Sequence, residues 1–295
     1  MKKDGPMYKP EELLLDFRIT SHCNLGCDLC FRNPGIQDNT TTEILSVIDR
    51  MYQIGFRKMG FTGGEPTSRK DYIELIKYAK RKGFLTYLST VGHRFSMDHA
   101  QLNDILDWVG IPIDGIDKEV NIDIRSDKMS NQHHVVKNIL NWLSGVNNKI
   151  NIKLTTVVSN SNIGKLHDII SWVNRLPYNV QSWRFYQFCP LGVGKEKREK
   201  LEIDEYLFLS EMRILKRDFP DVPISWATFE ERDKANIVME PNFDIIIPDG
   251  DNYTLLCNMK NDEKEKILSS IFGNPLVVKK CQDNRFWIEE RRMLK

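Results

Sequence analysis

Apolar and polar residues follow two patterns that alternate along the chain. Short runs rich in apolar and β-branched residues predict strands, and stretches with apolar residues every three or four positions predict amphipathic helices. The predicted strands span residues 13–20, 57–62, 84–90, 108–114, 149–158 and 182–188. The predicted helices span residues 41–54, 71–82, 97–106, 132–143 and 166–173. Thr40 and Glu43 form a capping box before the first helix, and Gly55 ends it.

Strands that alternate with helices favour a parallel sheet covered by its crossover helices. Six alternations predict an α/β fold, a partial (β/α)6 TIM-like barrel. After Pro190 the pattern changes to a helix over 205–217, short strands near Ile224 and Ile237, and a hairpin over 243–256. We therefore expect residues 1–190 to form the barrel core and residues 191–295 to form a small α+β cap packed on the barrel.

Charge and hydropathy narrow the class of protein. The 42 Lys and Arg residues nearly balance the 41 Asp and Glu residues, so no overall field favours nucleic acid or an anionic membrane. No apolar run approaches the roughly 20 residues of a membrane helix, and residues 1–12 lack the apolar region of a signal peptide. The sequence predicts a cytoplasmic protein with no membrane or nucleic-acid partner.

Three of the six cysteines lie within eight residues. Cys23, Cys27 and Cys30 have the spacing C-x3-C-x2-C directly after the first predicted strand. Closed zinc sites and ordinary iron–sulfur clusters have four protein ligands, so a 4Fe–4S cluster held by three would leave one iron open to a small molecule. A structural zinc site with His22 as fourth ligand is the alternative. The remaining cysteines are widely spaced and are interpreted as buried apolar side chains: Cys189, Cys257 and Cys281.

The cysteine spacing resembles that of the radical S-adenosylmethionine (SAM) superfamily, and further motifs extend the resemblance over about residues 16–190. Gly63, Gly64, Glu65 and Pro66 are similar to the family's GGEP turn, which meets the SAM amino group. Ser89 and Thr90 correspond to a loop near the SAM ribose. Leu29 corresponds to an apolar residue against the adenine, and Arg125 is a candidate ligand of the SAM carboxylate.

The resemblance implies an enzyme that uses one 4Fe–4S cluster and SAM, with Cys23, Cys27 and Cys30 as the cluster ligands. The reduced cluster would cleave SAM to a 5′-deoxyadenosyl radical, which abstracts a hydrogen atom from the substrate. An electron donor such as flavodoxin or ferredoxin is implied as a partner.

Within the superfamily the chain looks most like the viperin-like and molybdenum-cofactor-cyclase-like branches. Asn121, in the run DKEVNIDI, matches viperin's D-E-E-V-N run. Lys153 and Arg184 fit basic residues that hold a triphosphate in viperin, whereas Gly26 replaces a basic residue before the second cysteine. The resemblance implies a nucleotide or nucleoside-like small molecule as substrate. A peptide or protein side chain is the alternative substrate, and a non-catalytic, metal-stabilised protein is the alternative of another class.

Several of these residues also have a purely structural interpretation. Side chains alternate between the two faces of a strand, so Lys153 and Arg184 point either into the barrel or outward. Glu119, Asp123 and Arg125 could lie on a solvated helix face. The basic segment 194–200, GKEKREK, is interpreted as a solvated charge run.

Overall fold

The computed structural model describes residues 9–145, 148–178, 180–234 and 236–273. Its strands are β1 (Leu14–Arg18), β2 (Lys58–Thr62), β3 (Leu85–Ser89), β4 (Trp108–Pro112), β5 (Asn151–Val158), β6 (Ser182–Gln187), β7 (Ile224–Ala227), β8 (Val238–Met239), β9 (Asp244–Asp249) and β10 (Asn252–Asn258). Its α-helices are α1 (Thr41–Ile54), α2 (Tyr72–Lys82), α3 (Phe95–Leu102), α4 (Lys118–Ile124), α5 (Gln132–Leu143), α6 (Leu166–Val173), α7 (Arg198–Leu201), α8 (Glu205–Asp218), α9 (Phe229–Arg232) and α10 (Lys264–Phe272). Short 3₁₀-helices are η1 (Pro10–Glu12), η2 (Pro66–Ser68), η3 (Asp127–Met129), η4 (Ile163–Lys165) and η5 (Gly192–Lys197).

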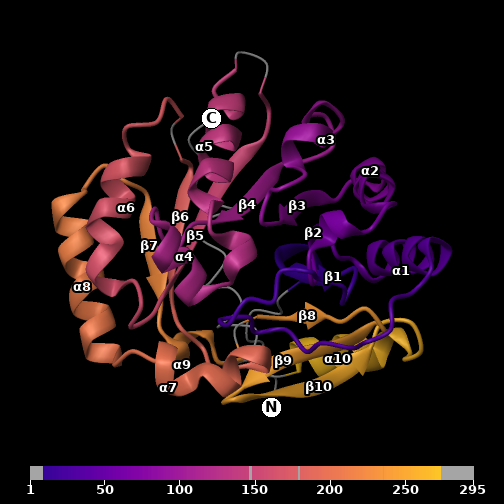
Figure 1. The fold of residues 1–295 in the computed structure, drawn as a ribbon. Coiled ribbons are helices and arrows are strands. Elements are labelled where there is room, and N and C mark those ends of the chain that lie inside the picture. Colours follow the sequence, from indigo (N-terminus) through magenta and orange to yellow (C-terminus); the bar gives the residue numbers. More distant parts are fainter. Residues whose placement is uncertain (1–8, 146–147, 179, 235, 274–295) are drawn as a thin grey trace.

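The described strands form one curved sheet in the order β10-β9-β8-β1-β2-β3-β4-β5-β6-β7. β1 to β7 pair in parallel, β8 is parallel to β1, and only the β8–β9 and β9–β10 pairs are antiparallel. The helices α1, α2, α3, α5, α6 and α8 lie on the outer side of the curve (Figure 1). The predicted α/β fold with a parallel, partial barrel is confirmed.

The helix boundaries follow the sequence signals closely at the first helix. The Thr40 hydroxyl accepts a hydrogen bond from the Glu43 amide at 3.3 Å, and the Glu43 carboxylate accepts one from the Thr40 amide at 3.0 Å. Gly55 ends α1 with φ +120°, as predicted. The helix predicted over 97–106 instead spans Phe95–Leu102, and the helix α4 lies where the sequence predicted only a loop.

Residues beyond 190 add strands to both edges of the barrel sheet. β7 pairs with β6, and β8 pairs with β1. The predicted short strands near Ile224 and Ile237 and the predicted hairpin are therefore confirmed, with the hairpin turn at Gly250. The C-terminal part extends the sheet, and the boundary at residue 190 stays a prediction.

The alternation of side chains along the strands separates the core from the barrel interior. Leu15 and Phe17 of β1 belong to the main apolar core, which fills the space between the sheet and its outer helices. Leu14, Asp16 and Arg18 of the same strand line an interior cavity instead. The core therefore fixes which polar residues face the interior.

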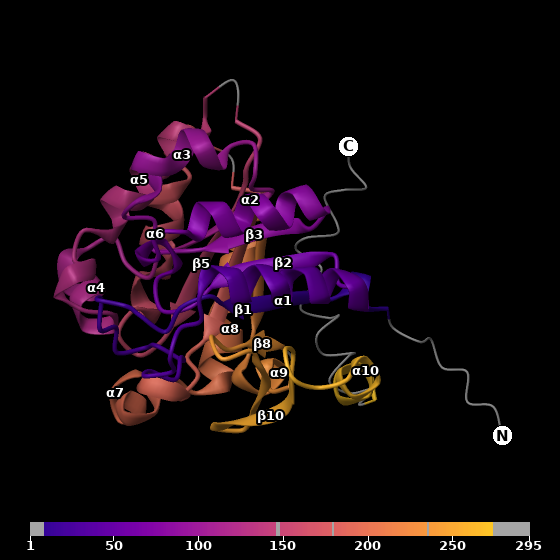
Figure 2. The same ribbon diagram turned by 90° about the vertical axis from the view of Figure 1, so that its right-hand side faces the viewer.

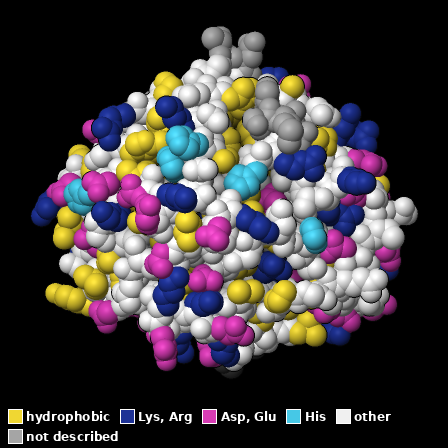
Figure 3. Space-filling view, in the orientation of Figure 1, with side chains coloured by type: hydrophobic (Ala, Val, Ile, Leu, Met, Phe, Trp, Pro, Cys, Tyr) yellow, Lys and Arg dark blue, Asp and Glu magenta, His cyan; other side chains and the backbone are white. Residues whose placement is uncertain are grey.

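Two short helices and the surface charges complete the description of the fold. Helices α4 and α7, which follow β4 and β6 in the chain, lie at the same side of the molecule (Figure 2). Basic and acidic side chains are interspersed over the face in Figure 3. In the described part of the chain, no helix is long and apolar enough to cross a membrane.

Candidate active site

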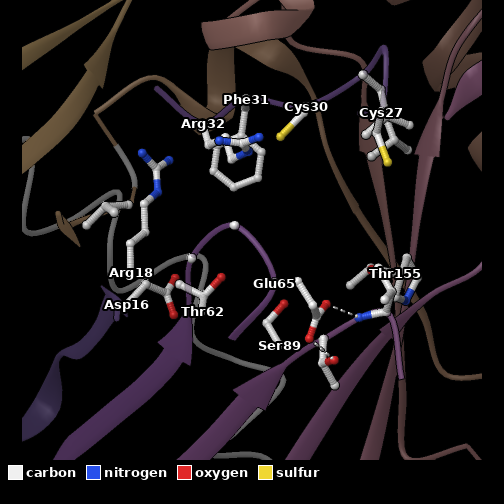
Figure 4. Close-up of a pocket in the computed structure, with 18 of the residues that line it drawn as sticks. Asp16, Arg18, Cys27, Cys30, Phe31, Arg32, Thr62, Glu65, Ser89 and Thr155 are labelled. Carbon is white, nitrogen blue, oxygen red and sulfur yellow. Dashed lines mark hydrogen bonds between the residues drawn. The ribbon is translucent and has the colours of Figure 1, made fainter. Parts of the chain in front are cut away.

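A cavity of about 280 Å³ lies at the carboxyl ends of the strands, where (β/α) barrels place their active sites. Cys27, Cys30, Phe31 and Arg32 lie on one side of it, and strand-end residues such as Glu65 lie opposite (Figure 4). The cavity is lined by residues of the cysteine loop, by the GGE turn and by inward side chains of β1 and β3 to β6. Arg232 and residues 236–238 complete its wall.

The structure brings the three cysteines of the motif together at this cavity. Cys23, Cys27 and Cys30 all line it and are free thiols. The chain between them turns at Gly26, whose φ of +68° is rarely adopted by a residue with a side chain. This backbone conformation gives a physical reason for glycine where viperin has a basic residue.

Each motif cysteine has an arginine in its electrostatic surroundings. Burial raises the pKa of the Cys23 thiol, and Arg32 opposes the rise. Burial likewise raises the pKa of the Cys27 thiol, against the charge and hydrogen bond of Arg125. Arg18 interacts electrostatically with Cys30. Arg32 and Arg125 thus oppose the effect of burial at two of the sulfurs, although both thiols keep a pKa above the usual value.

The sulfurs of the three motif cysteines border one shared space. Cysteine thiolates are the usual ligands of iron–sulfur clusters, so this donor set fits such a cluster. Within the described residues, no three His, Cys, Asp or Glu side chains converge closely enough to hold a single metal ion.

The segment after β6 contacts the cysteine loop through a backbone hydrogen bond and ion pairs. The Gly194 amide donates to the Cys30 carbonyl at 2.8 Å. Lys200 of α7 lies 3.3 Å from the Asp28 carboxylate in the loop and 3.0 Å from that of Asp123 in α4. Most charged side chains of GKEKREK are exposed, in agreement with a solvated charge run, and Lys197 also pairs with Asp28 at 3.4 Å.

The GGEP turn packs directly on the chain that leads into the cysteine loop. The Gly64 amide donates to the Thr20 carbonyl at 2.8 Å, and the Glu65 amide donates to the His22 carbonyl at 2.9 Å. A Cβ at Gly63 would overlap with the Thr20 carbonyl oxygen, and one at Gly64 with that of His22. The glycines thus allow the turn to position the cysteine loop.

Glu65 joins the GGEP turn to the loop after β3. Its buried carboxylate accepts hydrogen bonds from the Thr90 hydroxyl at 2.6 Å and from the Val91 amide at 3.0 Å. The Thr67 hydroxyl donates to the same carboxylate at 2.7 Å. Ser89 and Thr90 line the cavity beside it, and Pro66 does not. Glu65 therefore holds the predicted SAM-binding loops together.

Leu29 and Arg125 also line the cavity, as the resemblance implies. Leu29 packs in a small apolar cluster with Ile124, Phe188 and Leu201. The Arg125 side chain, only 10% exposed, donates a hydrogen bond to the Asp114 carboxylate. It follows α4 directly and does not lie on a solvated helix face, because Asp114 holds it against the cavity wall.

The three candidate substrate residues differ in where they lie. Lys153 points into the barrel and lines the cavity, where its amine is 3.1 Å from the Tyr186 hydroxyl. Arg184 is buried with its guanidinium 5.8 Å from the Tyr186 ring centroid, but it is not part of the cavity wall. Asn121 lies outside the cavity, because it is buried where its amide contacts the Ser130 carbonyl at 3.5 Å. It is therefore not part of the site proposed below.

Several polar residues of the barrel interior belong to no sequence motif. Asp16, Tyr87 and Tyr186 line the cavity from β1, β3 and β6. A Cβ at Gly60 would overlap with the Asp16 carboxylate, and one at Gly110 would overlap with the Tyr87 hydroxyl. Glycines inside two predicted strands were the available signal, since they mark the close approach of another group.

Asp16 is an acidic group of this interior, in addition to Glu65. Burial raises its pKa to about 6, although Lys153 and Arg18 lower it. Burial in turn lowers the pKa of Lys153, against the effects of Tyr186 and Asp16. The interior therefore combines cations with one carboxyl group that titrates near neutral pH.

The other cysteines differ in their surroundings. Cys257 belongs to the main apolar core, in agreement with its interpretation as a small apolar side chain. Cys189 is 5% exposed but lines the cavity. Cys281 lies outside the described residues.

Fold and site together define a class: an α/β-barrel enzyme whose cavity lies between a three-cysteine loop and the strand ends. The sequence matches the family model of the Radical SAM superfamily over residues 17–173, more than half of the chain. The chain therefore belongs to the radical SAM superfamily. Enzymes of this superfamily use a 4Fe–4S cluster and SAM.

Individual relatives agree with this membership. An S-adenosylmethionine-dependent nucleotide dehydratase of Flammeovirga pacifica is 28% identical over 208 residues, which cover 66% of this chain and 69% of the relative. A probable GTP 3′,8-cyclase of Pyrococcus horikoshii is 25% identical over 279 residues, 87% of each chain. The structure of Streptococcus suis SuiB bound to S-adenosylmethionine matches the fold with a TM-score of 0.66 at 13% identity, covering 91% of this chain and 67% of that chain.

Proposed function

We propose that the protein uses SAM-derived radical chemistry to modify a nucleotide or nucleoside-like small molecule. The observation that carries the proposal is the cavity itself. The cysteine loop, the GGEP turn and the inward cation Lys153 line one space of about 280 Å³. The names of the two sequence relatives above, a nucleotide dehydratase and a GTP cyclase, support a nucleotide as the substrate.

The proposed cofactor site follows from the residues around this space. Cys23, Cys27 and Cys30 would hold the 4Fe–4S cluster. Ser89, Thr90 and the GGEP turn, residues 63–66, would border SAM, with Leu29 against its adenine and Arg125 near its carboxylate. When bound, the cluster and SAM supply a 5′-deoxyadenosyl radical that abstracts hydrogen from the substrate.

The chain's own residues position the reactants and limit the access of water. Glu65 fixes the two predicted SAM loops relative to each other through Thr90 and Val91. The segment 192–201 covers the cysteine loop through Gly194 and Lys200. Lys153, at the cavity wall, would attract the anionic part of the substrate, and Arg184 would add positive charge from its place beside the Tyr186 ring.

The proposal includes a cellular setting. A cytoplasmic location suits an enzyme that depends on reduced cysteines. An electron donor such as flavodoxin or ferredoxin would reduce the cluster.

Two observations favour a second candidate substrate, a peptide or protein side chain. Gly26, in a left-handed conformation, removes a charge that could bind phosphate. Asp16 places a negative charge close to Lys153. Both features, Gly26 and Asp16, weaken the positive electrostatic potential that would bind a triphosphate.

The test measures 5′-deoxyadenosine formation by the anaerobically reconstituted, reduced protein with and without each common ribonucleoside triphosphate. We expect one nucleotide to accelerate formation strongly, and Lys153→Met to abolish that acceleration. Lys137→Met, on the exposed face of α5, is the matched control and should behave as the wild type. Slow formation that no nucleotide accelerates would contradict the nucleotide proposal and favour the peptide.

A further inference from the structure

Arg232, at the end of α9, is a cation of the cavity that the sequence motifs do not include. It lies outside the matched residues 17–173 and lines the cavity together with Lys153 and Tyr186. Its guanidinium lies 4.7 Å from the centroid of the Tyr186 ring and 5.9 Å from that of Phe31. The two rings hold the planar group by cation–π contacts and so fix its direction.

The hydrogen-bonding capacity of Arg232 is not fully used within the protein. Its Nε is buried and has no hydrogen-bond partner in the described part of the chain. A buried donor without a partner costs free energy, so such a group usually marks a ligand contact or an ordered water. Guanidinium donors match the geometry of phosphate and carboxylate oxygens.

The surroundings of Arg232 are electrostatically positive. Lys153 donates a hydrogen bond to the Tyr186 hydroxyl at 3.1 Å, on the ring that Arg232 covers. Burial raises the pKa of Tyr186, but Lys153, Arg184 and Arg232 outweigh burial and bring this pKa below its usual value. The opposing charges are Asp16, near Lys153, and Asp233, which follows Arg232 in the chain and lines a neighbouring pocket with it. The three cations around the Tyr186 phenol outnumber these two carboxyl groups.

We propose that Arg232 binds a phosphate group of the substrate, at the part of the cavity wall where Lys153 also contacts the Tyr186 ring. The inference rests on the proposed function, because it assumes an anionic, nucleotide-like ligand. It adds a residue from the C-terminal part of the chain to the substrate site. Arg232 would then help to distinguish phosphorylated from unphosphorylated ligands.

The test compares ligand binding by the reconstituted wild type, Arg232→Ala and Arg232→Lys in the presence of SAM. The probes are pyrophosphate alone, the ribonucleoside triphosphates and the matching nucleosides. We expect Arg232→Ala to bind pyrophosphate and the preferred triphosphate about 10- to 100-fold more weakly, as for a charged hydrogen bond that is lost. Arg232→Lys should recover part of this loss, because it restores the charge without the planar group.

Controls separate binding from folding. Arg213→Ala, on the exposed face of α8, should bind every probe as the wild type does. Arg232→Ala should keep its iron content, its affinity for SAM and its affinity for nucleosides. Equal loss of nucleoside and phosphate binding would show a merely structural role and overturn the proposal.

The remaining outcomes distinguish this proposal from the proposed function. If the wild type binds pyrophosphate in an Arg232-dependent way but binds no nucleotide, Arg232 stands as a phosphate-binding residue and the nucleotide substrate fails. If Arg232→Ala binds all phosphorylated probes as tightly as the wild type, the role of Arg232 is overturned and the nucleotide substrate stands. If the wild type binds neither pyrophosphate nor any nucleotide, both fail.

Discussion

Asp16→Asn should stabilise the protein, and the gain should grow with pH. Burial raises the pKa of Asp16 from 3.8 to about 6, even though Lys153 and Arg18 oppose the rise. The native state therefore holds this proton more tightly than the unfolded state does. The free energy of unfolding then falls as the pH rises through the interval from 3.8 to about 6, and it stays low above that interval.

The pKa values set the size of the effect. A difference of about two pH units corresponds to about 3 kcal/mol at neutral pH. Asparagine has nearly the shape of the protonated carboxyl group but cannot ionise. The stability difference between Asp16→Asn and the wild type should therefore grow from about 1.5 kcal/mol near pH 5 to about 3 kcal/mol near pH 8. The pKa of Asp16 already contains the attraction of Lys153 and Arg18.

Urea denaturation of the anaerobically reconstituted proteins near pH 5 and near pH 8 measures this difference. Asp16→Ala provides a control, because it removes the same titration but also leaves a cavity. It should show the same change between the two pH values, shifted by a constant cost. A stability difference between Asp16→Asn and the wild type that stays constant or shrinks as the pH rises would refute the reasoning.

Three other substitutions test the packing around the site. Gly110→Ala should destabilise the protein by about 1 to 3 kcal/mol in thermal denaturation, because its Cβ would overlap with the buried Tyr87 hydroxyl. The control Gly164→Ala should cost much less, because no atom lies within 4 Å of its Cβ. Equal losses of stability would contradict the close packing of Tyr87 against Gly110. Thr90→Val should lower stability by about 1 to 3 kcal/mol and weaken SAM binding in calorimetry, since Glu65 loses a hydrogen bond; unchanged SAM affinity would argue against a positioning role. Lys200→Met should lower the free energy of unfolding in urea by no more than about 1 kcal/mol, because the Lys200 side chain is 40% exposed. A larger loss would contradict the expectation that these exposed ion pairs contribute little stability.

The barrel was predictable because its signals are local. The capping box at Thr40 and the stop at Gly55 mark α1 within a few residues of sequence. Strand pairing at the two sheet edges is not local. Arg18 in β1 meets Glu240, just after β8, at 2.5 Å across 222 residues, and no sequence periodicity encodes that contact. The short helix α4 was missed because its seven residues are too few to show a clear period.

The residues of the candidate site also differ in whether local sequence signals reveal them. Cys23, Cys27 and Cys30 and the GGEP turn are recognisable because their chemistry depends on spacing within one loop. Asp16 and Arg232 belong to the cavity only through strand register and through the packing of the C-terminal part. Asn121 shows the reverse case, since it matches a motif by sequence but is buried outside the cavity.

The most direct test of the central claim is cleavage of SAM by the reconstituted, dithionite-reduced protein, followed as 5′-deoxyadenosine. The account predicts formation by the wild type and by Cys257→Ala, whose cysteine lies in the apolar core. It predicts loss of both the cluster and the product in Cys27→Ala. If Cys27→Ala kept its cluster and its SAM cleavage, the assignment of the cysteine loop as the cluster site would be wrong.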